Sequence, residues 1–228
     1  MIFLKKTKPV KKYKIKYKSI IICFLVIYIV YFLINQFLSI KISNIYILNN
    51  IYLSDQEIIE IANLQDYPNT FKNRCGVIKD ELLESDYIKD VKVSKKNLSE
   101  VYIEVIENTP LFYNLSLNKT VLSNNKTVDD KLNVPTLINY VPDTIYDKFI
   151  EKMNLLDSDI LNRISEIEYN PNDVDTERFI LTMIDDNYVY LTLYKFESIN
   201  NYTDIIKNFE DKKGILYLDS GEYFKVME

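Results

Sequence analysis

Histidine and tryptophan are absent from this chain of 228 residues, and glycine and cysteine are scarce. Because there is no histidine, Ser-His and Cys-His nucleophilic pairs and histidine-bound metals are excluded. With only three glycines, the chain has no glycine-rich phosphate-binding loop. Cys23 lies inside a long apolar run and Cys75 lies well beyond it, so the two cysteines provide no disulfide framework. These absences remove most of the common catalytic, metal and cofactor chemistries.

Paired carboxylates are the remaining source of acid–base chemistry. They occur as Asp129-Asp130, Glu166 with Glu168, and Asp185-Asp186. A glycosidase works with two carboxylates, but the aspartate pairs are typical of solvated turns, and the glutamates alternate along the outward face of a predicted strand. The D-x-[DN]-x-[DN]-G spacing of a calcium loop is also missing. We therefore predict a protein that is not an enzyme, with no catalytic, cofactor-binding or metal-binding residues and no small-molecule substrate.

The long apolar run lies near the start of the chain. Residues 20–34 are fifteen consecutive apolar residues, and the apolar character continues to residue 40. A helix over 20–40 is about 31 Å long, enough to cross a hydrocarbon core of about 30 Å. Residues 1–19 carry eight lysines and no acidic residue, and positive flanks stay on the cytoplasmic side. We expect a basic cytoplasmic segment (1–19), one transmembrane helix (20–40) and an extracytoplasmic remainder, a single-pass type II arrangement in the cytoplasmic membrane.

A cleaved signal peptide and a buried core helix fit this run less well than a membrane anchor does. A signal peptide has a shorter apolar region and a small-residue cleavage site, and residues 35–41 (N-Q-F-L-S-I-K) provide no such site. A buried core helix would not be preceded by a cluster of charges of one sign. The lysines themselves either set the topology alone or also contact anionic lipid on the cytoplasmic leaflet.

The extracytoplasmic part is acidic. Residues 41–228 contain 20 basic and 33 acidic side chains, a net charge of about −13. A protein that binds nucleic acid neutralises phosphates with a basic surface, so we do not expect a nucleic acid partner.

Residues 41–109 predict a small β-α-α-β-β module. Residues 42–48 suit a strand, and Asn49-Asn50 supplies a turn. Ser54 and Glu57 have the spacing of a capping box at the start of a helix. A second helix is expected over 73–84, with inward-facing Val77, Ile78, Leu82 and Leu83, and apolar alternation then predicts strands around 91–94 and 101–106.

Residues 110–228 predict a second, mixed α/β domain dominated by antiparallel sheet. Short strands are expected over 111–139 and helices over 143–163. Two apolar runs, 179–184 and 188–193, flank Asp185-Asp186-Asn187 and predict a hairpin. Helical spacing follows over 199–209, and strands near 215–218 and 223–226 end the chain. The fold class is therefore α+β, behind a single transmembrane helix.

This combination resembles the FtsQ/DivIB family of bacterial cell-division proteins, whose first extracytoplasmic module is a POTRA domain and whose second is a β domain. The similar segments are I-S-N-I-Y-I-L-N-N (42–50), S-D-Q-E-I (54–58), L-L-E-S-D-Y-I-K-D-V-K-V-S-K-K (82–96), V-Y-I-E-V-I-E-N-T-P (101–110), V-P-T-L (134–137) and G-I-L-Y-L-D-S-G-E-Y-F (214–224). Glu107 and Pro110 stand where the family has its Val-x-Glu-x-x-Pro ending. The chain departs from the family at Asn49-Asn50, in place of Gly-Asn, and at S-N-N-K-T-V (123–128), in place of an Asp-x-x-Gly turn.

The resemblance implies a divisome scaffold at the division septum. Its implied partners are FtsB/DivIC-like and FtsL-like single-span division proteins, bound by the membrane-distal β domain, while the POTRA-like module helps recruitment. An exposed sheet edge accepts a partner strand through its free N–H and C=O groups. By position, the receiving edge is expected at the C-terminal strands, with partner-binding residues Leu216, Tyr217, Leu218, Tyr223, Phe224 and Val226. Two alternatives remain: a signal-anchored peptidoglycan hydrolase, and a POTRA-type transport or assembly component, although no train of amphipathic barrel strands follows.

Overall fold

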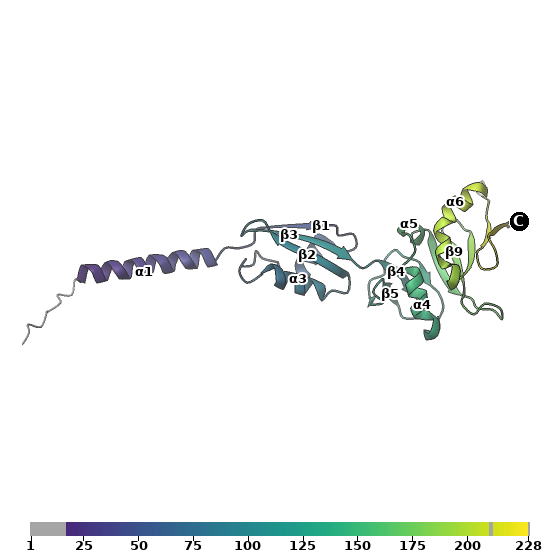
Figure 1. The fold of residues 1–228 in the computed structure, drawn as a ribbon, viewed down its shortest axis with the longest axis horizontal. Coiled ribbons are helices and arrows are strands. Elements are labelled where there is room, and N and C mark those ends of the chain that lie inside the picture. The colour runs from purple at the N-terminus through teal and green to yellow at the C-terminus, as the bar shows by residue number, and fades with distance from the viewer. Residues whose placement is uncertain (1–16, 210–211, 228) are drawn as a thin grey trace, which may run out of the picture.

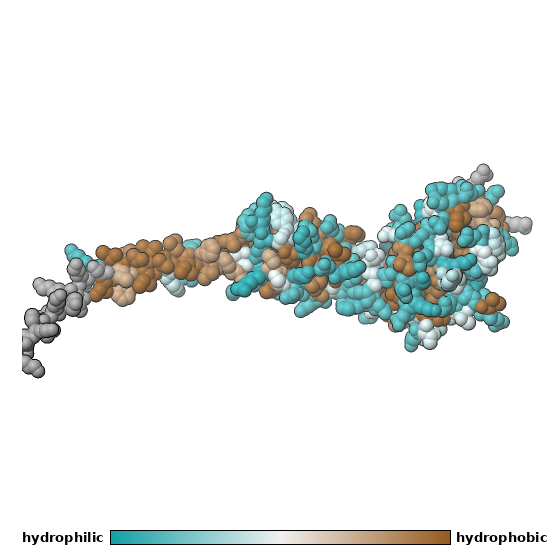
Figure 2. Space-filling model, in the orientation of Figure 1, coloured by the Kyte–Doolittle hydropathy of each residue, from teal (hydrophilic) through white to brown (hydrophobic). Residues whose placement is uncertain are grey.

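The computed structural model describes residues 17–209 and 212–227, which form a helix and two modules arranged in a row (Figure 1). Helix α1 (Tyr17–Leu38) contains the apolar stretch Ile20–Leu38, whose 19 residues are enough to cross a membrane. None of this stretch is buried in the protein, and it forms a continuous apolar rod in Figure 2. Most of the predicted basic segment 1–19 lies outside the described residues.

The membrane-proximal module has the predicted order β-α-α-β-β. Its elements are β1 (Asn44–Leu48), α2 (Asp55–Ile61), α3 (Cys75–Leu83), β2 (Ile88–Lys95) and β3 (Glu100–Glu107). The sheet order is β1-β3-β2, with β1 parallel and β2 antiparallel to the central strand β3. The inward side chains of β3 are buried against the two helices, in a core with the members Ile58, Ile78, Leu82, Val101, Ile103 and Val105.

Two predicted core residues of α3 are instead exposed. Ile78 and Leu82 are buried, whereas Val77 and Leu83 remain 41% and 39% exposed. The helix is only nine residues long, and positions four apart define its single buried stripe. Val77 and Leu83 each directly neighbour a stripe residue, so they lie about 100° away around the helix.

Short-range hydrogen bonds and one long-range contact hold the β1–α2 connection. The predicted capping box forms: the Glu57 N–H donates to Ser54 Oγ at 3.3 Å, and the Ser54 N–H donates to the Glu57 carboxylate at 2.7 Å. The Glu107 carboxylate, at the end of β3, accepts the N–H groups of Ile51, Tyr52 and Leu53 at 2.7, 2.8 and 3.0 Å. Glu107 thereby ties the turn after β1 to the central strand.

The membrane-distal module is built on one nine-stranded sheet of order β12-β11-β10-β9-β8-β7-β4-β5-β6. Five of the eight strand pairings are antiparallel, which confirms the predicted mixed sheet with antiparallel pairs in the majority. The strands are β4 (Pro110–Asn114), β5 (Lys119–Leu122), β6 (Thr127–Val128), β7 (Thr136–Leu137), β8 (Ile164–Tyr169), β9 (Arg178–Met183), β10 (Tyr188–Thr192), β11 (Gly214–Tyr217) and β12 (Tyr223–Val226).

Helices cover one face of this sheet. They are α4 (Asp143–Met153), α5 (Ser158–Leu161), the 3₁₀ helices η1 (Leu193–Asn201) and η2 (Lys207–Phe209), and α6 (Tyr202–Ile206). Phe149 of α4 stacks on Phe179 of β9, with ring centroids 4.8 Å apart, and meets Phe196 of η1 edge-on at 5.9 Å. This aromatic cluster joins the helices to the sheet and leaves the opposite face of β9–β12 open.

Candidate partner-binding edge

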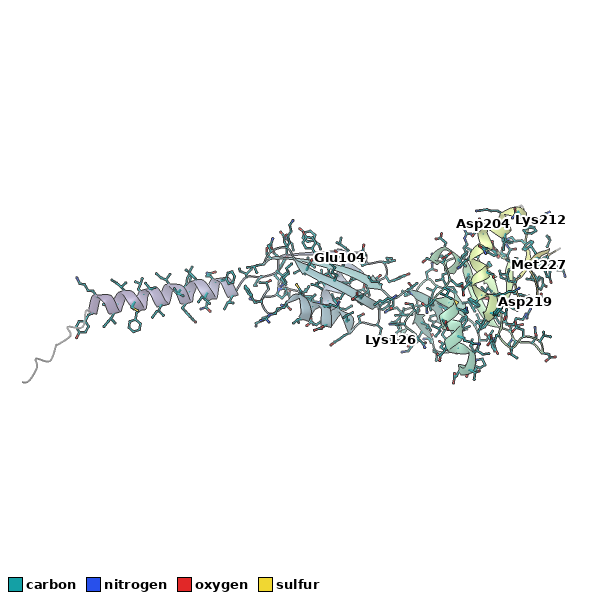
Figure 3. The ribbon with its side chains drawn as sticks, viewed as in Figure 1. Glu104, Lys126, Asp204, Lys212, Asp219 and Met227 are labelled. Carbon is teal, nitrogen blue, oxygen red and sulfur yellow. The ribbon has the colours of Figure 1, made fainter. Side chains whose placement is uncertain are left out.

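The C-terminal strand β12 forms one edge of the nine-stranded sheet, at the end of the molecule away from α1 (Figure 1). It pairs with β11 in antiparallel register, with Leu216 opposite Phe224 and Tyr217 opposite Tyr223. The N–H of Met227, one residue beyond the strand, donates to the Lys213 carbonyl at 2.9 Å. In Figure 3, Met227 and Asp219 are labelled at this far end.

The register decides which main-chain groups of β12 are free. In an antiparallel ladder, residues that bond the neighbouring strand alternate with residues whose N–H and C=O point the other way. Since Met227 bonds Lys213, Lys225 and Tyr223 also face β11, and Phe224 and Val226 present their N–H and C=O groups outward. No described residue bonds these outward groups beyond the ladder itself.

The six predicted partner-binding residues lie in different environments. Leu216 and Leu218 are core residues, each 1% exposed. Leu216 belongs to β11, an interior strand with β10 on its other side, and Leu218, one residue beyond β11, donates its N–H to the Tyr190 carbonyl of β10 at 2.7 Å. Phe224 is half-buried and packs against Phe209, with ring centroids 4.5 Å apart. Tyr223 and Val226 are exposed, at 50% and 44%. The side chains that are exposed at the edge are therefore those of Tyr223, which packs against Tyr217, and of Val226, which lies on the opposite face of the sheet.

A row of tyrosines runs across the open face of the sheet to this edge. Tyr217 stacks on Tyr223, with centroids 4.7 Å apart and planes inclined by 13°, and meets Tyr190 edge-on at 5.1 Å. The Arg178 guanidinium lies 4.4 Å from the Tyr190 ring centroid and pairs with Asp219 at 2.9 Å. Both members of this ion pair are only 13% exposed, so the inner end of the row is fixed.

Sequence reasoning missed Arg178, Tyr190 and Asp219. They join the tyrosine row because β10 pairs in parallel with β11, which brings Tyr190 opposite Tyr217. A parallel pairing between strands more than twenty residues apart leaves no local signal. The alternation Tyr188-Val189-Tyr190, with valine inward, was the one available indication that Tyr190 faces outward.

The two aspartate pairs considered for chemistry are engaged in structural contacts, and of the glutamate pair Glu168 accepts a hydrogen bond from Asn170 Nδ2 at 3.0 Å. Asp185 accepts a hydrogen bond from the buried Tyr202 hydroxyl at 2.8 Å, and burial followed by this bond raises the pKa of Tyr202 above its usual range. Asp186 pairs with Lys213 at 2.6 Å. Asp130 accepts from the Tyr87 hydroxyl at 2.7 Å. Within residues 17–209 and 212–227, no group of three or more cysteine or acidic side chains is placed to hold a metal.

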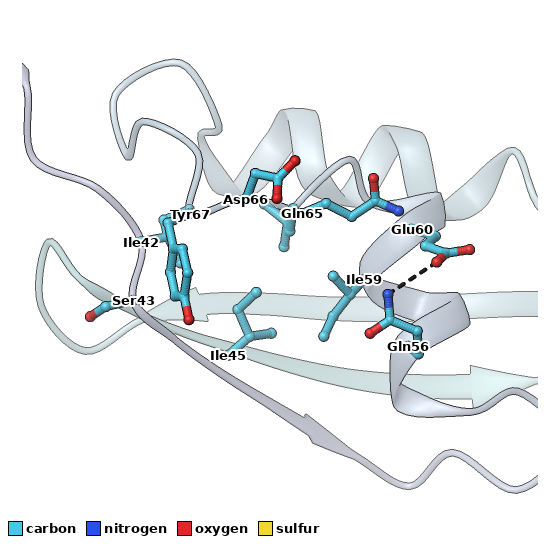
Figure 4. Close-up of a pocket in the computed structure, with 10 residues that line it drawn as sticks. Ile42, Ser43, Ile45, Gln56, Ile59, Glu60, Gln65, Asp66 and Tyr67 are labelled. Carbon is cyan, nitrogen blue, oxygen red and sulfur yellow. Dashed lines mark hydrogen bonds between the residues drawn. The ribbon is translucent and has the colours of Figure 1, made fainter.

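A second free strand edge lies near the membrane. Strand β1 is an edge of the three-stranded sheet, and a depression of about 560 Å³ separates it from α2 (Figure 4). Ile45 and Ile59 lie on its floor, and Gln56 donates to Glu60 at 3.0 Å on its rim. The rim is polar and open to solvent, unlike the apolar enclosure of a small-molecule site.

Comparison with known proteins agrees with this architecture. The POTRA domain of the FtsQ type matches residues 40–108. The cell division protein DivIB of Bacillus subtilis is 27% identical over 196 residues, which covers 81% of this chain and 74% of that protein. DivIB of Listeria monocytogenes is 27% identical over 195 residues (81% and 72%), and DivIB of Bacillus anthracis is 27% identical over 233 residues (97% and 85%).

Among solved structures, the major extracytoplasmic domain of DivIB from Geobacillus stearothermophilus aligns with 46% of this chain and 96% of its own length, at 19% identity and a TM-score of 0.38. The sequence relationship is the stronger finding, since it extends across both modules and the POTRA match covers the β-α-α-β-β unit. Behind the single apolar span α1, the chain therefore carries a POTRA domain of the FtsQ type, and over most of its length it is similar to DivIB cell-division proteins.

Proposed function

We propose that this protein is a non-enzymatic scaffold of the divisome, which binds FtsB/DivIC-like and FtsL-like single-span proteins outside the membrane at the division septum. The partner adds a strand to β12, so the binding residues proposed are those of the β12 edge and its neighbour β11. The free main chain of Phe224 and Val226 is the observation that carries this proposal.

The other edge of the same sheet is less suited to strand addition. Strand β6 has only two residues, Thr127 and Val128. The preceding Lys126 is held by an ion pair to Asp86 of the POTRA domain at 2.6 Å. A strand of two residues between fixed neighbours offers little main chain to a partner, whereas β12 has four residues and no strand beyond it.

The geometry allows an estimate of what strand addition contributes. Two outward residues offer two N–H donors and two C=O acceptors, and each net hydrogen bond is worth about 0.5–1.5 kcal/mol, so the main chain contributes roughly 2–6 kcal/mol. That alone gives weak binding, because association costs several kcal/mol. Burial of the exposed Tyr223 ring, at the end of the tyrosine row, supplies the further affinity and the specificity.

Val226→Pro tests this proposal because it removes an outward N–H without breaking a bond to β11. Proline is tolerated at a sheet edge when its nitrogen faces away from the neighbouring strand. Val226→Thr is the matched control, since it keeps the N–H and the β-branched shape. Since one hydrogen bond is lost, we expect Val226→Pro to reduce recovery of a single-span division protein from membranes by roughly two- to ten-fold, while Val226→Thr keeps it.

Recovery of the same partner with Val226→Pro at the wild-type level would refute strand addition at β12. A wild-type chain that recovers no single-span division protein, and that stains the whole membrane uniformly when tagged instead of concentrating at mid-cell, would refute the divisome scaffold itself.

A further inference from the structure

The outer end of α1 is bonded directly to a loop of the POTRA domain. The Leu38 carbonyl accepts a hydrogen bond from Asn69 Nδ2 at 2.5 Å, and the Ile40 carbonyl accepts the Thr70 N–H at 3.0 Å. The Phe37 and Phe71 rings lie 5.1 Å apart. These contacts fix loop 67–74 against Phe37, Leu38 and Ile40, at the outer end of the apolar span.

The β2–β3 turn lies at the same end of the domain. Lys95 Nζ donates to the Thr70 and Asn73 carbonyls at 2.8 and 2.7 Å, which joins the turn to loop 67–74. The Ser99 carbonyl accepts the N–H of Ser43 at 2.9 Å, just beyond α1. We call Lys41, loop 67–74 and turn 95–99 together the membrane-facing tip; it is the end of the POTRA domain that α1 enters in Figure 1.

The tip is basic, although the extracytoplasmic part as a whole is acidic. It carries Lys41, Lys72, Arg74, Lys95 and Lys96, and no aspartate or glutamate; the acids Asp66 and Glu100 directly flank it along the chain. Lys41, Lys72, Arg74 and Lys96 are exposed, and none forms an ion pair with an acid in the described part of the chain. Exposed Tyr67 and Leu98 lie among these cations and have the apolar character of interfacial residues.

We propose that the membrane-facing tip rests on the outer leaflet, with its four exposed cations on the phosphates of anionic phospholipids. The occupant is the bilayer itself, because α1 brings the tip to the headgroup region whenever it spans the membrane. Lys95 is a positioning residue that holds the two loops together. Contact of the membrane-facing tip with the outer leaflet fixes the orientation of the POTRA domain on the membrane. This role is independent of the proposed strand addition at β12.

The absence of tryptophan permits a direct test with the full chain. Leu98→Trp places a single fluorophore on turn 95–99. The protein is reconstituted in vesicles of phosphatidylcholine, or of phosphatidylcholine and phosphatidylglycerol in roughly equal amounts, and both vesicle types contain the same fraction of phosphatidylcholine brominated near the head of its acyl chains as quencher. Each cation near an anionic surface changes the seated population by roughly five-fold, so we expect several-fold stronger quenching with phosphatidylglycerol, and its loss at high salt.

In the same reporter, the combined variant Lys41→Gln, Lys72→Gln, Arg74→Gln and Lys96→Gln should reduce quenching to the phosphatidylcholine level. The matched control neutralises four exposed cations elsewhere, Lys89, Lys131, Arg163 and Lys212, and should leave quenching unchanged.

Equal quenching in both vesicle types, or equal loss in the two combined variants, would overturn the proposal. A chain that does not float with the vesicles would overturn it together with the single-pass topology, without bearing on partner binding at β12.

Discussion

We expect substitution of Glu107 to destabilise the POTRA domain more than substitution of any other single acidic residue in it. Its carboxylate accepts three consecutive N–H groups, those of Ile51, Tyr52 and Leu53. In Glu107→Ala, water can reach the N–H groups of exposed Ile51 and Tyr52, but Leu53 is only 7% exposed and its N–H loses its partner. An unpaired buried donor costs about 1–3 kcal/mol, and the two exposed charge-assisted bonds add roughly 1 kcal/mol, so we expect a loss near 3 kcal/mol.

Amide hydrogen exchange resolves this loss within the full chain, since it reports the two modules separately. A loss of about 3 kcal/mol corresponds to exchange on the order of a hundred-fold faster at protected amides of β3, such as that of Ile103. Amides of β9, in the other module, should be unchanged. Glu107→Gln keeps one acceptor oxygen and should lose about half as much.

Glu104→Ala is the matched control, because Glu104 lies on the same strand and forms only an exposed ion pair with Lys92 at 3.6 Å. Exposed ion pairs contribute about 0–1 kcal/mol to the free energy of unfolding, so Glu104→Ala should accelerate amide exchange in β3 by less than roughly five-fold. If Glu107→Ala accelerates exchange no more than Glu104→Ala does, the carboxylate contacts do not stabilise the turn and the reasoning is refuted.

Two further predictions concern β12 and the cap of α2. A Cβ on Gly214 would meet the Lys225 carbonyl oxygen and approach the Phe224 ring to 2.5 Å. Gly214→Ala should therefore displace β12 and lower the free energy of unfolding by about 1–3 kcal/mol. The loss should be seen as faster amide exchange at Lys225, and unchanged exchange there would contradict this prediction. The pKa of Glu57 lies below its ordinary 4.5 because the Ser54 hydroxyl and then the Ser54 backbone N–H donate to its carboxylate. A carboxylate whose pKa is lower in the folded protein than in the unfolded chain stabilises the fold at pH values above the unfolded pKa. In denaturant titrations, the excess in free energy of unfolding of wild type over Glu57→Gln should therefore shrink as pH falls below 4.5. An excess that does not change with pH would contradict this prediction.

The elements that the sequence predicted correctly are those with a local signal. The capping box at Ser54 and Glu57 is a pattern of four residues, and it forms as expected. The apolar alternation of β3 is equally local, and the hairpin of β9 and β10 turns at Asp186, which adopts a φ of 65°. In each case the interacting groups are close in the chain, so composition and spacing were sufficient.

The features that the sequence did not predict depend on contacts between distant segments. Glu107 reaches Ile51 across 56 positions, and nothing in its own strand indicates that target. The parallel pairing of β10 with β11 makes β11 an interior strand, which buries Leu216 and leaves β12 as the edge. Sequence position alone indicated that the last strand lies at a sheet edge, while only the register separates the buried residues from the exposed residues there.

The central claim, that a partner strand adds to β12, is tested most directly by residue-resolved amide exchange with and without the bound partner. The N–H groups of Phe224 and Val226 point away from β11, whereas that of Lys225 already faces it. We predict that partner binding slows exchange at Phe224 and Val226 and changes Lys225 much less. A partner that binds while exchange at Phe224 and Val226 stays at its free rate would contradict the claim.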